Sequence, residues 1–320
     1  MKYPVLAILL CQLVQPVVWA ADTMRAVVLT DGKLQVQSVP IPEPQAGQIR
    51  IHVRAASVNP VDWKLAARAA PGTSSIPGRD LAGVVDAVGP NAGGWRPGQS
   101  VIAIATGGAY AEYAIASSRA VAFKPVHMSF DEEAGIPVVG ETAWRAMVTV
   151  GNVQVGQRVL IHGGAGGVGS SAVQIAKARG AHVIATASPS HDALLHALGA
   201  EETVDYHSAH FADALKNFDV VLNTVDADTN MRSIAMVKPG GILVSVVGAP
   251  PAADCAAAQI RCAITGPVTG EFLGALSELA DHEQFHINIE QRLPLSDAAK
   301  AWDLNRSGHT GGKIILEVSH

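Results

Sequence analysis

The stretch Arg158–Arg179, RVLIHGGAGGVGSSAVQIAKAR, decides the fold. Its apolar start, Arg158–His162, predicts a buried strand, and the spacing of Val168–Arg179 predicts a helix that Gly180 ends. Between them the sequence matches G-x-G-x-x-G, whose glycines allow a tight turn and the close approach of a pyrophosphate to the helix N-terminus. We therefore interpret this turn as a dinucleotide-binding site formed by Gly164, Ala165, Gly166, Gly167, Val168 and Gly169.

The residues after this turn repeat the alternation of strand and helix. Further strands are expected at His182–Ala187, Phe218–Leu222 and Ile242–Val247, with helices at Leu194–Leu198 and Thr229–Val237. Such alternation is typical of a parallel, doubly wound sheet that is covered by helices on both faces. We assign residues 148–265 to this α/β domain.

The regions on either side have a different pattern. From Arg25 to about Phe123 the chain consists of short β-branched or alternating runs separated by Gly and Pro, the last at Ala109–Ala116. Ser129-Phe130-Asp131-Glu132 has the pattern of a capping box and predicts the start of a helix. After residue 266 we expect two helices and a closing strand, Lys313–Val318, that returns to the first domain. The predicted organisation is a mostly antiparallel β domain at 24–147, the α/β domain at 148–265, and a return to the β domain at 266–320.

The cofactor is selected where the second of these strands ends, at Ser188-Pro189-Ser190-His191. A site for NAD places Asp or Glu here to bind the ribose 2′-hydroxyl, and that carboxylate would repel a 2′-phosphate. No carboxylate stands at this point, whereas Ser188 and Ser190 can donate hydrogen bonds to a phosphate. We therefore predict NADPH as the cofactor. Against this, no Lys or Arg is near, and serines are also ordinary turn residues.

Composition and charge exclude several classes of protein. The 320 residues are 48% hydrophobic and 16% charged, with no low-complexity tract, which is typical of a globular chain with a large aliphatic core. The net charge of −5 and the scattered basic residues argue against a nucleic-acid partner. Cys11, Cys255 and Cys262 form no C-x-x-C pair, so no zinc lobe is expected. Cys255 and Cys262 form one disulfide if the protein is exported, or else stay as two free thiols.

Residues 1–20 differ from the rest of the chain. Lys2 precedes the apolar run Val5–Val14, and Val18-Trp19-Ala20 has the residues that a signal peptidase accepts. This pattern predicts a secretory signal peptide, cleaved before Ala21, and a periplasmic or secreted protein. The alternative is a true start at Met24 and a cytoplasmic protein. No other segment reaches about 18 uncharged apolar residues, so no membrane span is expected.

Several ordered motifs give the chain a resemblance to a known family. They are Ser57-Val58-Asn59-Pro60-Val61-Asp62-Trp63-Lys64, Pro77–Val85, Gly108–Tyr113, His162–Gly169 and Gly311–Leu316. Taken in this order, they resemble the zinc-independent quinone oxidoreductase branch of the medium-chain dehydrogenase/reductase superfamily. The resemblance extends from Met24 to the C-terminus. It implies a GroES-like β domain with a Rossmann domain inserted into it.

The resemblance also indicates the chemistry. The zinc branch of the family has a cysteine in the region of Asn59–Asp62 and Gly-His-Glu where this chain has Gly78-Arg79-Asp80. Without these ligands alcohol oxidation lacks its Lewis acid. Hydride addition to a quinone or a conjugated carbonyl needs only water or one donor to stabilise the oxygen. We therefore predict an NADPH-dependent, zinc-independent oxidoreductase that reduces quinones or α,β-unsaturated carbonyls.

Further site residues follow from the resemblance, position by position. Asn59 would lie beside the nicotinamide ribose or the substrate carbonyl, and Lys64 would point at the nicotinamide site or the developing oxyanion. An Asx turn and a solvated lysine are the simpler explanations for these two residues. The other positions expected to contact the cofactor are Thr142, Tyr206 near the 2′-phosphate, Val225, Val247, Gly248 and Lys313. The family often has arginine before the closing Gly-Lys pair, where this chain has Gly311.

The expected partner is a small quinone or enone, and we expect the chain to form a homodimer. A second function stays open, that of a non-catalytic dinucleotide-binding or scaffold protein outside the cytoplasm. The signal-peptide pattern motivates it, because NADPH is not maintained in the periplasm and no twin-arginine motif is present for export with bound cofactor. The complete glycine turn and the absence of a carboxylate at Ser188 favour the enzyme.

Overall fold

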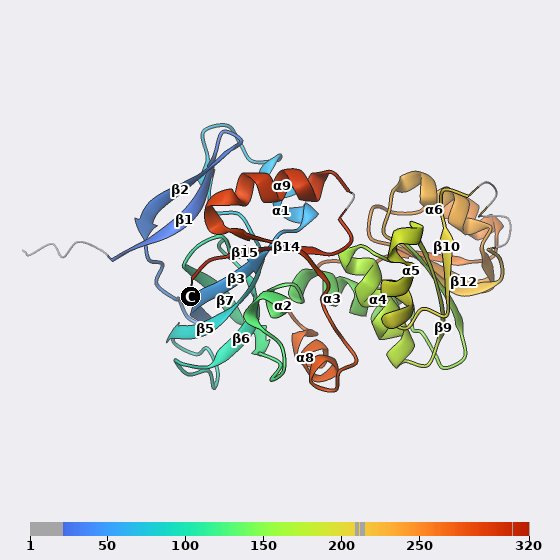
Figure 1. Ribbon diagram of the computed structural model, residues 1–320, viewed down its shortest axis with the longest axis horizontal. Coiled ribbons are helices and arrows are strands. Elements are labelled where there is room, and N and C mark those ends of the chain that lie inside the picture. The colour runs from blue at the N-terminus through green and yellow to red at the C-terminus, as the bar shows by residue number, and fades with distance from the viewer. Residues whose placement is uncertain (1–21, 209–210, 212–214, 309, 320) are drawn as a thin grey trace, which may run out of the picture.

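Two lobes and the helices between them make up the protein (Figure 1). The computed structural model describes residues 22–208, 211, 215–308 and 310–319, so the expected signal peptide lies outside the described residues. The antiparallel sheets lie on the left of Figure 1, the parallel sheet lies on the right, and α3 and α4 lie between them. A single hydrophobic cluster includes Ile102 of the antiparallel lobe, Val139 of α3 and Ile161 of the parallel sheet, so it joins the two lobes.

The parallel sheet confirms the expected doubly wound domain. Its strand order is β10-β9-β8-β11-β12-β13, and each neighbouring pair is parallel. The strands are β8 (Arg158–His162), β9 (His182–Ala187), β10 (Glu202–Asp205), β11 (Phe218–Asn223), β12 (Val237–Ser245) and β13 (Arg261–Ile264). The chain runs outward in one direction from β8 to β10 and in the other from β11 to β13. The loops after β8 and β11 therefore diverge at the centre of the sheet, which is where α/β folds bind ligands.

The helices of this domain alternate with the strands, as the sequence predicts. They are α4 (Gly167–Ala178), η2 (Pro189–His191), α5 (Asp192–Ala197), α6 (Ala227–Ile234) and α7 (Ala252–Ala257). The expectation of a helix as far as Val237 is wrong. The Phe218 N–H donates to the Met236 carbonyl at 3.0 Å, and Val237 pairs with Phe218. The backbone here therefore belongs to the sheet.

The antiparallel lobe contains two sheets. The smaller has the order β2-β1-β4, from β1 (Thr23–Thr30), β2 (Lys33–Pro40) and β4 (Ser74–Ser75). The larger has the order β14-β15-β3-β5-β6-β7, and β3 also pairs with β7. Its strands are β3 (Gln48–Ser57), β5 (Asp80–Val88), β6 (Ser100–Ala105), β7 (Tyr113–Phe123), β14 (Ile289–Pro294) and β15 (Lys313–Glu317). The extra pairing curls this sheet into the barrel of a GroES-like domain.

The closing strand returns to the first lobe, as predicted. β15 pairs antiparallel with β3, Ile315 opposite Ser57, and the two strands lie side by side in Figure 1. The expectation of a strand over Ala109–Ala116 is wrong in its first half. The N–H groups of Ala109 and Tyr110 donate to the carbonyls of Gly78 and Pro77, so this segment forms a loop and β7 begins at Tyr113.

The remaining helices cover the antiparallel lobe and the junction. They are α1 (Pro60–Ala66), α2 (Phe130–Ala134), α3 (Pro137–Trp144), the π-helical turn η1 (Arg145–Val150), α8 (Leu273–Asp281), η4 (Leu295–Asp297) and α9 (Ala298–Arg306). The predicted capping box is confirmed. The Glu132 carboxylate accepts from the Ser129 N–H at 2.8 Å, and the Ser129 side chain accepts from the Glu132 N–H at 3.4 Å.

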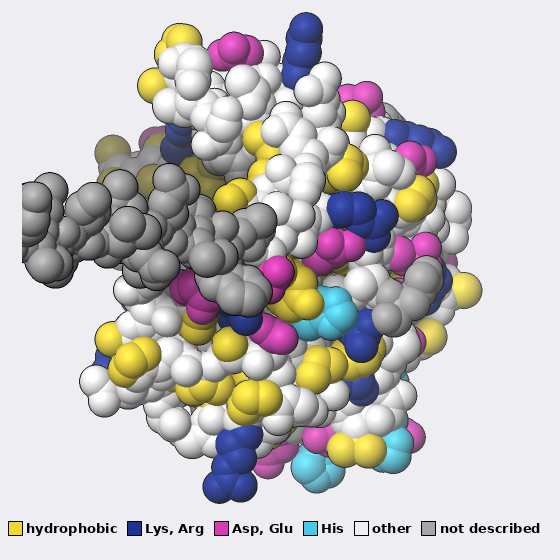
Figure 2. Space-filling view, turned by 90° about the vertical axis from the view of Figure 1, so that its left-hand side faces the viewer, with side chains coloured by type: hydrophobic (Ala, Val, Ile, Leu, Met, Phe, Trp, Pro, Cys, Tyr) yellow, Lys and Arg dark blue, Asp and Glu magenta, His cyan; other side chains and the backbone are white. Residues whose placement is uncertain are grey.

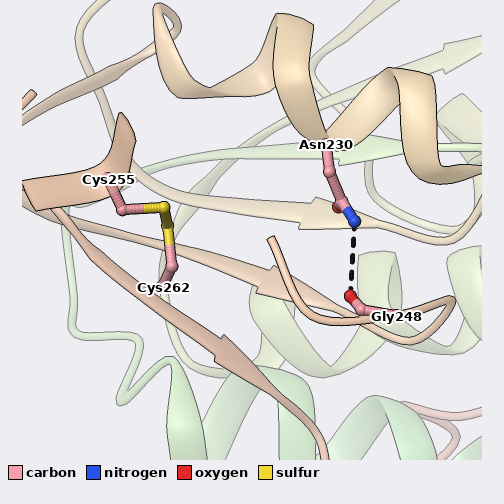
Figure 3. The surroundings of a disulfide bond; sticks show 4 residues. All are labelled: Asn230, Gly248, Cys255 and Cys262. Carbon is pink, nitrogen blue, oxygen red and sulfur yellow. Dashed lines mark hydrogen bonds between the residues drawn. A yellow bond between two sulfur atoms is a disulfide. The ribbon is translucent and has the colours of Figure 1, made fainter. Parts of the chain in front are cut away.

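One disulfide crosses the outer edge of the parallel sheet (Figure 3). It joins Cys255 of α7 to Cys262 of β13, with Cα atoms 6.2 Å apart. Of the two alternatives for these cysteines, the structure has the bonded one. The segment between β12 and α7 includes Gly248, whose carbonyl accepts from Asn230 Nδ2 of α6 at 3.3 Å.

The surface carries charges of both signs. Among the described residues on the face in Figure 2, basic and acidic side chains are interspersed and are not gathered into a basic stripe. Within the described ranges of the chain, no helix has both the length and the apolar character that crossing a bilayer requires.

Candidate functional site

The glycine turn has the crowding expected of a dinucleotide-binding loop. A Cβ atom at Gly169 would lie 2.1 Å from the Gly163 carbonyl oxygen, and one at Gly164 would lie 2.8 Å from the Ala185 Cβ. These two glycines therefore permit the tight turn and the close packing of helix on strand. At Gly166 the same test meets nothing nearer than the Gly163 oxygen at 3.5 Å. The open side of the loop is thus at the N-cap of α4, where a phosphate would approach.

The N-terminus of α4 supplies the donors for that phosphate. Gly166 is the N-cap, with extended backbone, and no side chain caps the helix. The first N–H groups of an α-helix have no partner within the helix and carry a partial positive charge. Gly167, Val168 and Gly169 begin this helix, so the residues present fit a pyrophosphate.

Four of the other residues expected at the cofactor lie at the carboxyl ends of the parallel strands. Tyr206 follows β10, Val225 follows β11, and Val247 and Gly248 follow β12. The exposed fractions of Tyr206, Val225 and Val247 are 47%, 51% and 38%, which is high for apolar and aromatic side chains. Of these side chains, Val225 comes nearest to the glycine turn, since its Cγ2 lies 3.2 Å from where a Cβ atom at Gly163 would be. Exposed apolar side chains at this edge of the sheet are suited to contact a flat, partly apolar ligand.

Thr142 lies on the helix that packs against the glycine turn. Val139, on the same helix, packs on the turn, since its Cγ1 lies 2.9 Å from where a Cβ atom at Gly167 would be. Thr142 lies three residues after Val139, which is about one turn of α3. Thr142 is half-buried, and its hydroxyl donates to the Val138 carbonyl at 2.7 Å. The structure therefore places Thr142 about one helical turn from the residue that packs on the glycine turn, and its contact with the cofactor stays a prediction.

A cluster of polar side chains marks the end of β9. Ser188 Oγ lies 2.9 Å from His191 Nδ1 and 3.1 Å from Ser190 Oγ. A Cβ atom at Gly311 would lie 2.3 Å from His191 Nε2, so the imidazole occupies the space that a larger residue at position 311 would need. The His191 ring thus fills the space where the family often has the side chain of an arginine at the position of Gly311.

A buried polar cluster forms the second part of the site, and it centres on Lys313. The Lys313 ammonium donates to Asn59 Oδ1 at 2.6 Å and to the Val58 carbonyl at 3.1 Å. It lies 3.9 Å from Asp80 Oδ2, which also accepts from Asn59 Nδ2 at 2.8 Å. Asn59, Asp80 and Lys313 are 1%, 0% and 5% exposed. Asn59 and Lys313 are thus brought together as a bonded pair.

Burial shifts the proton affinities of this cluster. It raises the pKa of the Asp80 carboxyl, although Lys313 and the donors Asn59, Ser57 and Val138 N–H act in the opposite direction. It lowers the pKa of the Lys313 ammonium, while Asp80 and Asp62 oppose that change. The Asp80 carboxylate and the Lys313 ammonium are both buried, and each stabilises the charge of the other. Loss of either group should therefore destabilise the cluster.

Asp62 extends the cluster through α1 and toward a cavity. Its Oδ2 accepts from the Asn59 N–H at 2.9 Å and from the Tyr110 hydroxyl at 2.8 Å. The Trp302 indole donates to that hydroxyl at 3.3 Å. Asp62 is 4% exposed, and burial raises the pKa of its carboxyl to about 7.

The cavity beside Asp62 has a volume of about 460 Å³. It lies between α1, the start of β5 and the end of β6, and its charged lining residues are Asp62 and Arg79. Arg79 is half-buried, and its guanidinium donates to the Val268 carbonyl at 3.3 Å. The remaining lining is largely apolar and includes Leu65, Ile76 and Ile104. A small apolar molecule with one polar end fits such a space.

Lys64 is not brought to the cluster. It is exposed on α1, and its ammonium lies 5.3 Å from the centre of the Trp63 ring. Asp62, Tyr110 and Trp302 also belong to the cluster, although they were not predicted as site residues. The spacing Asn59-Pro60-Val61-Asp62, in which a carboxylate can cap the first turn of a helix, could have identified Asp62.

The donor set of the cluster suits hydrogen bonding. Within the residues that the structure describes, no group of three or more His, Cys, Asp or Glu side chains could hold a metal ion. The buried Asp80 carboxylate has the Lys313 ammonium 3.9 Å away. A divalent cation would meet that positive charge.

Comparison with known proteins gives the same architecture. Residues 45–126 match a family model described as alcohol dehydrogenase GroES-like domain, and residues 198–316 match one described as zinc-binding dehydrogenase. A chloroplastic quinone-oxidoreductase of Triphysaria versicolor is 31% identical over 87% of this chain and 92% of that protein. A 2-methylene-furan-3-one reductase of Solanum lycopersicum is 32% identical over 87% of this chain and 74% of that protein. A solved quinone oxidoreductase from Coxiella burnetii has a TM-score of 0.82 and 32% identity, covering 93% of this chain and all of that one.

Proposed function

Because the chain belongs to the quinone oxidoreductase branch of the medium-chain dehydrogenase/reductase superfamily, we propose that it reduces quinones or α,β-unsaturated carbonyls with NADPH and without zinc. Two similar proteins are named as a quinone-oxidoreductase and as a reductase of a methylene-furanone, which is a conjugated carbonyl compound. Both substrate classes accept hydride at an electron-poor carbon or oxygen.

The observation that carries this proposal is the link between the glycine turn and the cavity. The Lys313 Cδ lies 3.2 Å from where a Gly167 Cβ would be, and the Lys313 ammonium bonds to Asn59. Asn59 in turn bonds to Asp62, which lines the cavity. Buried side chains therefore connect the phosphate loop to the cavity, so the two sites lie close to each other. Hydride transfer requires that a dinucleotide and a small molecule are bound next to each other.

The chain's own residues bind and orient the reactants in this proposal. Lys313 holds the side-chain amide of Asn59 by a hydrogen bond of 2.6 Å, and the largely apolar lining of the cavity would contact the apolar part of a substrate. Bound NADPH would supply the hydride. The Arg79 guanidinium lines the same cavity and can stabilise negative charge that develops on a carbonyl oxygen.

Zinc independence is supported by the residue types at the positions of the family's metal ligands. Asn59 and Arg79 offer an amide and a guanidinium, neither of which is a ligand that Zn²⁺ favours. We expect the purified protein to contain no stoichiometric zinc and to keep its activity in a chelator. One zinc per chain by elemental analysis would contradict this part of the proposal.

The choice of NADPH is supported by Ser188, Ser190 and His191, whose polar atoms converge within 3.4 Å of one another. The unmodified protein should bind NADPH at least several-fold more tightly than NADH. Ser188→Asp would place a carboxylate against the 2′-phosphate and should reverse this preference. Fluorescence titration of both nucleotides measures it. Ser296→Asp, an exposed serine of η4, is the matched control and should keep the preference. Equal or tighter NADH binding by the unmodified protein would contradict the assignment.

We further propose that the protein is exported. The signal-peptide pattern of residues 1–20 supports this, and so does the Cys255–Cys262 disulfide, since such bonds persist mainly in oxidising compartments. N-terminal sequencing of protein from its native source should find a chain that begins at Ala21. A cytosolic chain beginning at Met24 would contradict export and leave the reductase proposal intact.

A further inference from the structure

Two charged residues line the cavity, Arg79 and Asp62, and they differ in what they offer a bound molecule. The Asp62 carboxyl group faces other protein groups. Its Oδ2 accepts from the Asn59 N–H and the Tyr110 hydroxyl, and its Oδ1 is buried. Arg79 is half-buried, so part of this residue remains accessible. The accessible charge of the cavity is therefore positive.

The Arg79 side chain follows the lining of the cavity. The Arg79 carbonyl accepts from the Ala105 N–H at 2.7 Å, and its guanidinium donates to the Val268 carbonyl at 3.3 Å. Ala105 lines the cavity, and so does Thr269, the residue after Val268. The side chain thus extends between two points of the lining, and its charged end lies beside the segment Val268–Thr269.

This charged end has unused donors and no counter-charge. Among the residues that the structure describes, the guanidinium has the hydrogen bond to Val268 and forms no ion pair. A guanidinium has five N–H donors, so most of them are left for water or a ligand. Glu141, which accepts from the Thr269 N–H at 2.7 Å, is paired with Arg145 at 3.1 Å. The carboxylate that binds this segment is thus neutralised by another cation.

The segment that holds the guanidinium is itself fixed. Glu141 accepts from the N–H groups of Thr269 and Gly270 at 2.7 and 2.5 Å. A Cβ atom at Gly270 would lie 2.4 Å from Ala120 Cα, so the backbone here is packed tightly against β7. Arg79 is therefore held at one nitrogen by a rigid acceptor. The planar fork of its other N–H groups suits the two oxygens of a carboxylate.

We propose that the acceptor that this protein reduces carries a carboxylate group, which Arg79 binds. The apolar lining of the cavity, which includes Leu65, Ile76 and Ile104, would contact the rest of the molecule. One cation in such a lining matches a single negative charge, because a second charge would be buried without a partner. This inference rests on the proposed reductase function and names the class of its substrate.

The reaction itself is unchanged by this assignment. One alkene carbon of the acceptor gains a hydride from NADPH, the other gains a proton from water, and the C=C π bond is lost. The carboxylate neither forms nor breaks a bond. Arg79 would therefore determine which acceptors bind.

The test compares 3-benzoylacrylate, a conjugated keto acid, with its primary amide, which has the same size and no charge. The negative charge makes the acid the poorer hydride acceptor in solution, so a preference for it would have to come from the protein. We expect kcat/KM to be about 10-fold or more higher for the acid. In Arg79→Gln the KM of the acid should rise by about 10- to 100-fold, whereas the amide should be affected little.

Two further variants sharpen this comparison. Arg79→Lys keeps the charge without the planar fork, so its KM for the acid should lie between those of the unmodified protein and Arg79→Gln. Arg96→Gln, at an exposed position of the antiparallel lobe, is the matched control and should keep the preference for the acid.

A second measurement detects the carboxylate site without turnover. Calorimetric titration with 3-benzoylpropionate, the saturated acid, and with its amide should show tighter binding of the acid, and Arg79→Gln should remove the difference. Saturating NADP⁺ is present, so that the acid cannot bind at the glycine turn. This comparison needs only the unmodified protein, so it decides even where Arg79→Gln does not fold.

Equal affinities for the saturated acid and its amide would overturn the inference. So would an Arg79→Gln protein that loses the same factor of kcat/KM with acid and amide, because Arg79 would then act on the carbonyl oxygen that both share. If the saturated acid binds through Arg79 while no quinone or enone oxidises NADPH, the proposed function fails and the carboxylate site stands.

Discussion

The glycine turn and the Asn59–Asp80–Lys313 cluster are built in opposite ways. The turn is made of backbone from six consecutive residues, and its shape depends on the absence of side chains at Gly164 and Gly169. The cluster is made of side chains, and its shortest bond joins residues 254 positions apart in the sequence. The first can form as soon as one strand and one helix meet, whereas the second exists only after β15 has returned to β3. Binding and chemistry should therefore respond differently to mutation.

The largest effect is expected in the cluster. Lys313→Met removes the cation beside Asp80 and leaves that buried carboxyl without its counter-charge. The free energy of unfolding should fall by about 3 to 5 kcal/mol, as for other buried pairs that lose one partner. Urea unfolding followed by circular dichroism measures it. Lys300→Met, at an exposed position on α9, is the control. Equal urea midpoints for the two variants would show that the cluster does not stabilise the packing of β15.

The two lobes should also respond to pH in opposite directions. Burial lowers the pKa of His162, at the end of β8, from an ordinary value of 6.5 to about 4. The unfolded chain thus binds a proton that the folded chain does not, and up to about 3 kcal/mol of stability should be lost as the pH falls from 6.5 toward 4. Asp62 has its pKa raised from 3.8 to about 7, so its contribution is full below 3.8 and is lost as the pH rises through 7.

Single substitutions separate these two pH responses. His162→Asn, which can still bond to the Thr186 hydroxyl, should flatten the acid side of the stability curve. Asp62→Asn should flatten only the side between pH 3.8 and 7. Thermal unfolding across the pH range measures both. An acid side unchanged by His162→Asn would assign the loss of stability to other groups.

A smaller effect is expected in the turn, where two alanine substitutions should have different consequences. Gly169→Ala forces a Cβ to within 2.1 Å of the Gly163 oxygen and should cost about 1 to 3 kcal/mol of stability. The Cβ of Gly166→Ala would meet only the Gly163 oxygen, at an ordinary contact distance of 3.5 Å, so stability should change by less than about 0.5 kcal/mol. The new methyl group would still stand where the pyrophosphate approaches, and NADPH affinity should fall. If folded Gly166→Ala protein bound NADPH with full affinity, the pyrophosphate would not bind at the N-terminus of α4.

The contrast also explains what could be predicted from the sequence. β8 and β9 have the predicted bounds, and α4 begins one residue early, because strand, turn and helix follow one another locally. The prediction was wrong at Val237 because the backbone there pairs with β11, a partner that lies outside the local pattern.

The cluster could be predicted only in part. The resemblance named Asn59 and Lys313, but it could not show that they bond to each other or that Asp80 lies between them. Tyr110 lies in the motif Gly108–Tyr113, but the motif gave it no role, because its place in the cluster depends on a loop whose backbone bonds to Pro77 and Gly78. Lys64, which the resemblance placed in the site, faces outward because it lies on the exposed side of a short helix.

The central claim is that this chain transfers hydride from NADPH to a conjugated acceptor. The direct test uses protein lacking residues 1–20, NADPH deuterated at the reactive C4 position, and an enone, with mass spectrometry of the product. We expect one deuterium at the β-carbon of the saturated ketone, and a lower yield of labelled product when NADH deuterated at the same position replaces the NADPH. An unlabelled product, or no product with any enone or quinone while NADPH still binds, would contradict it.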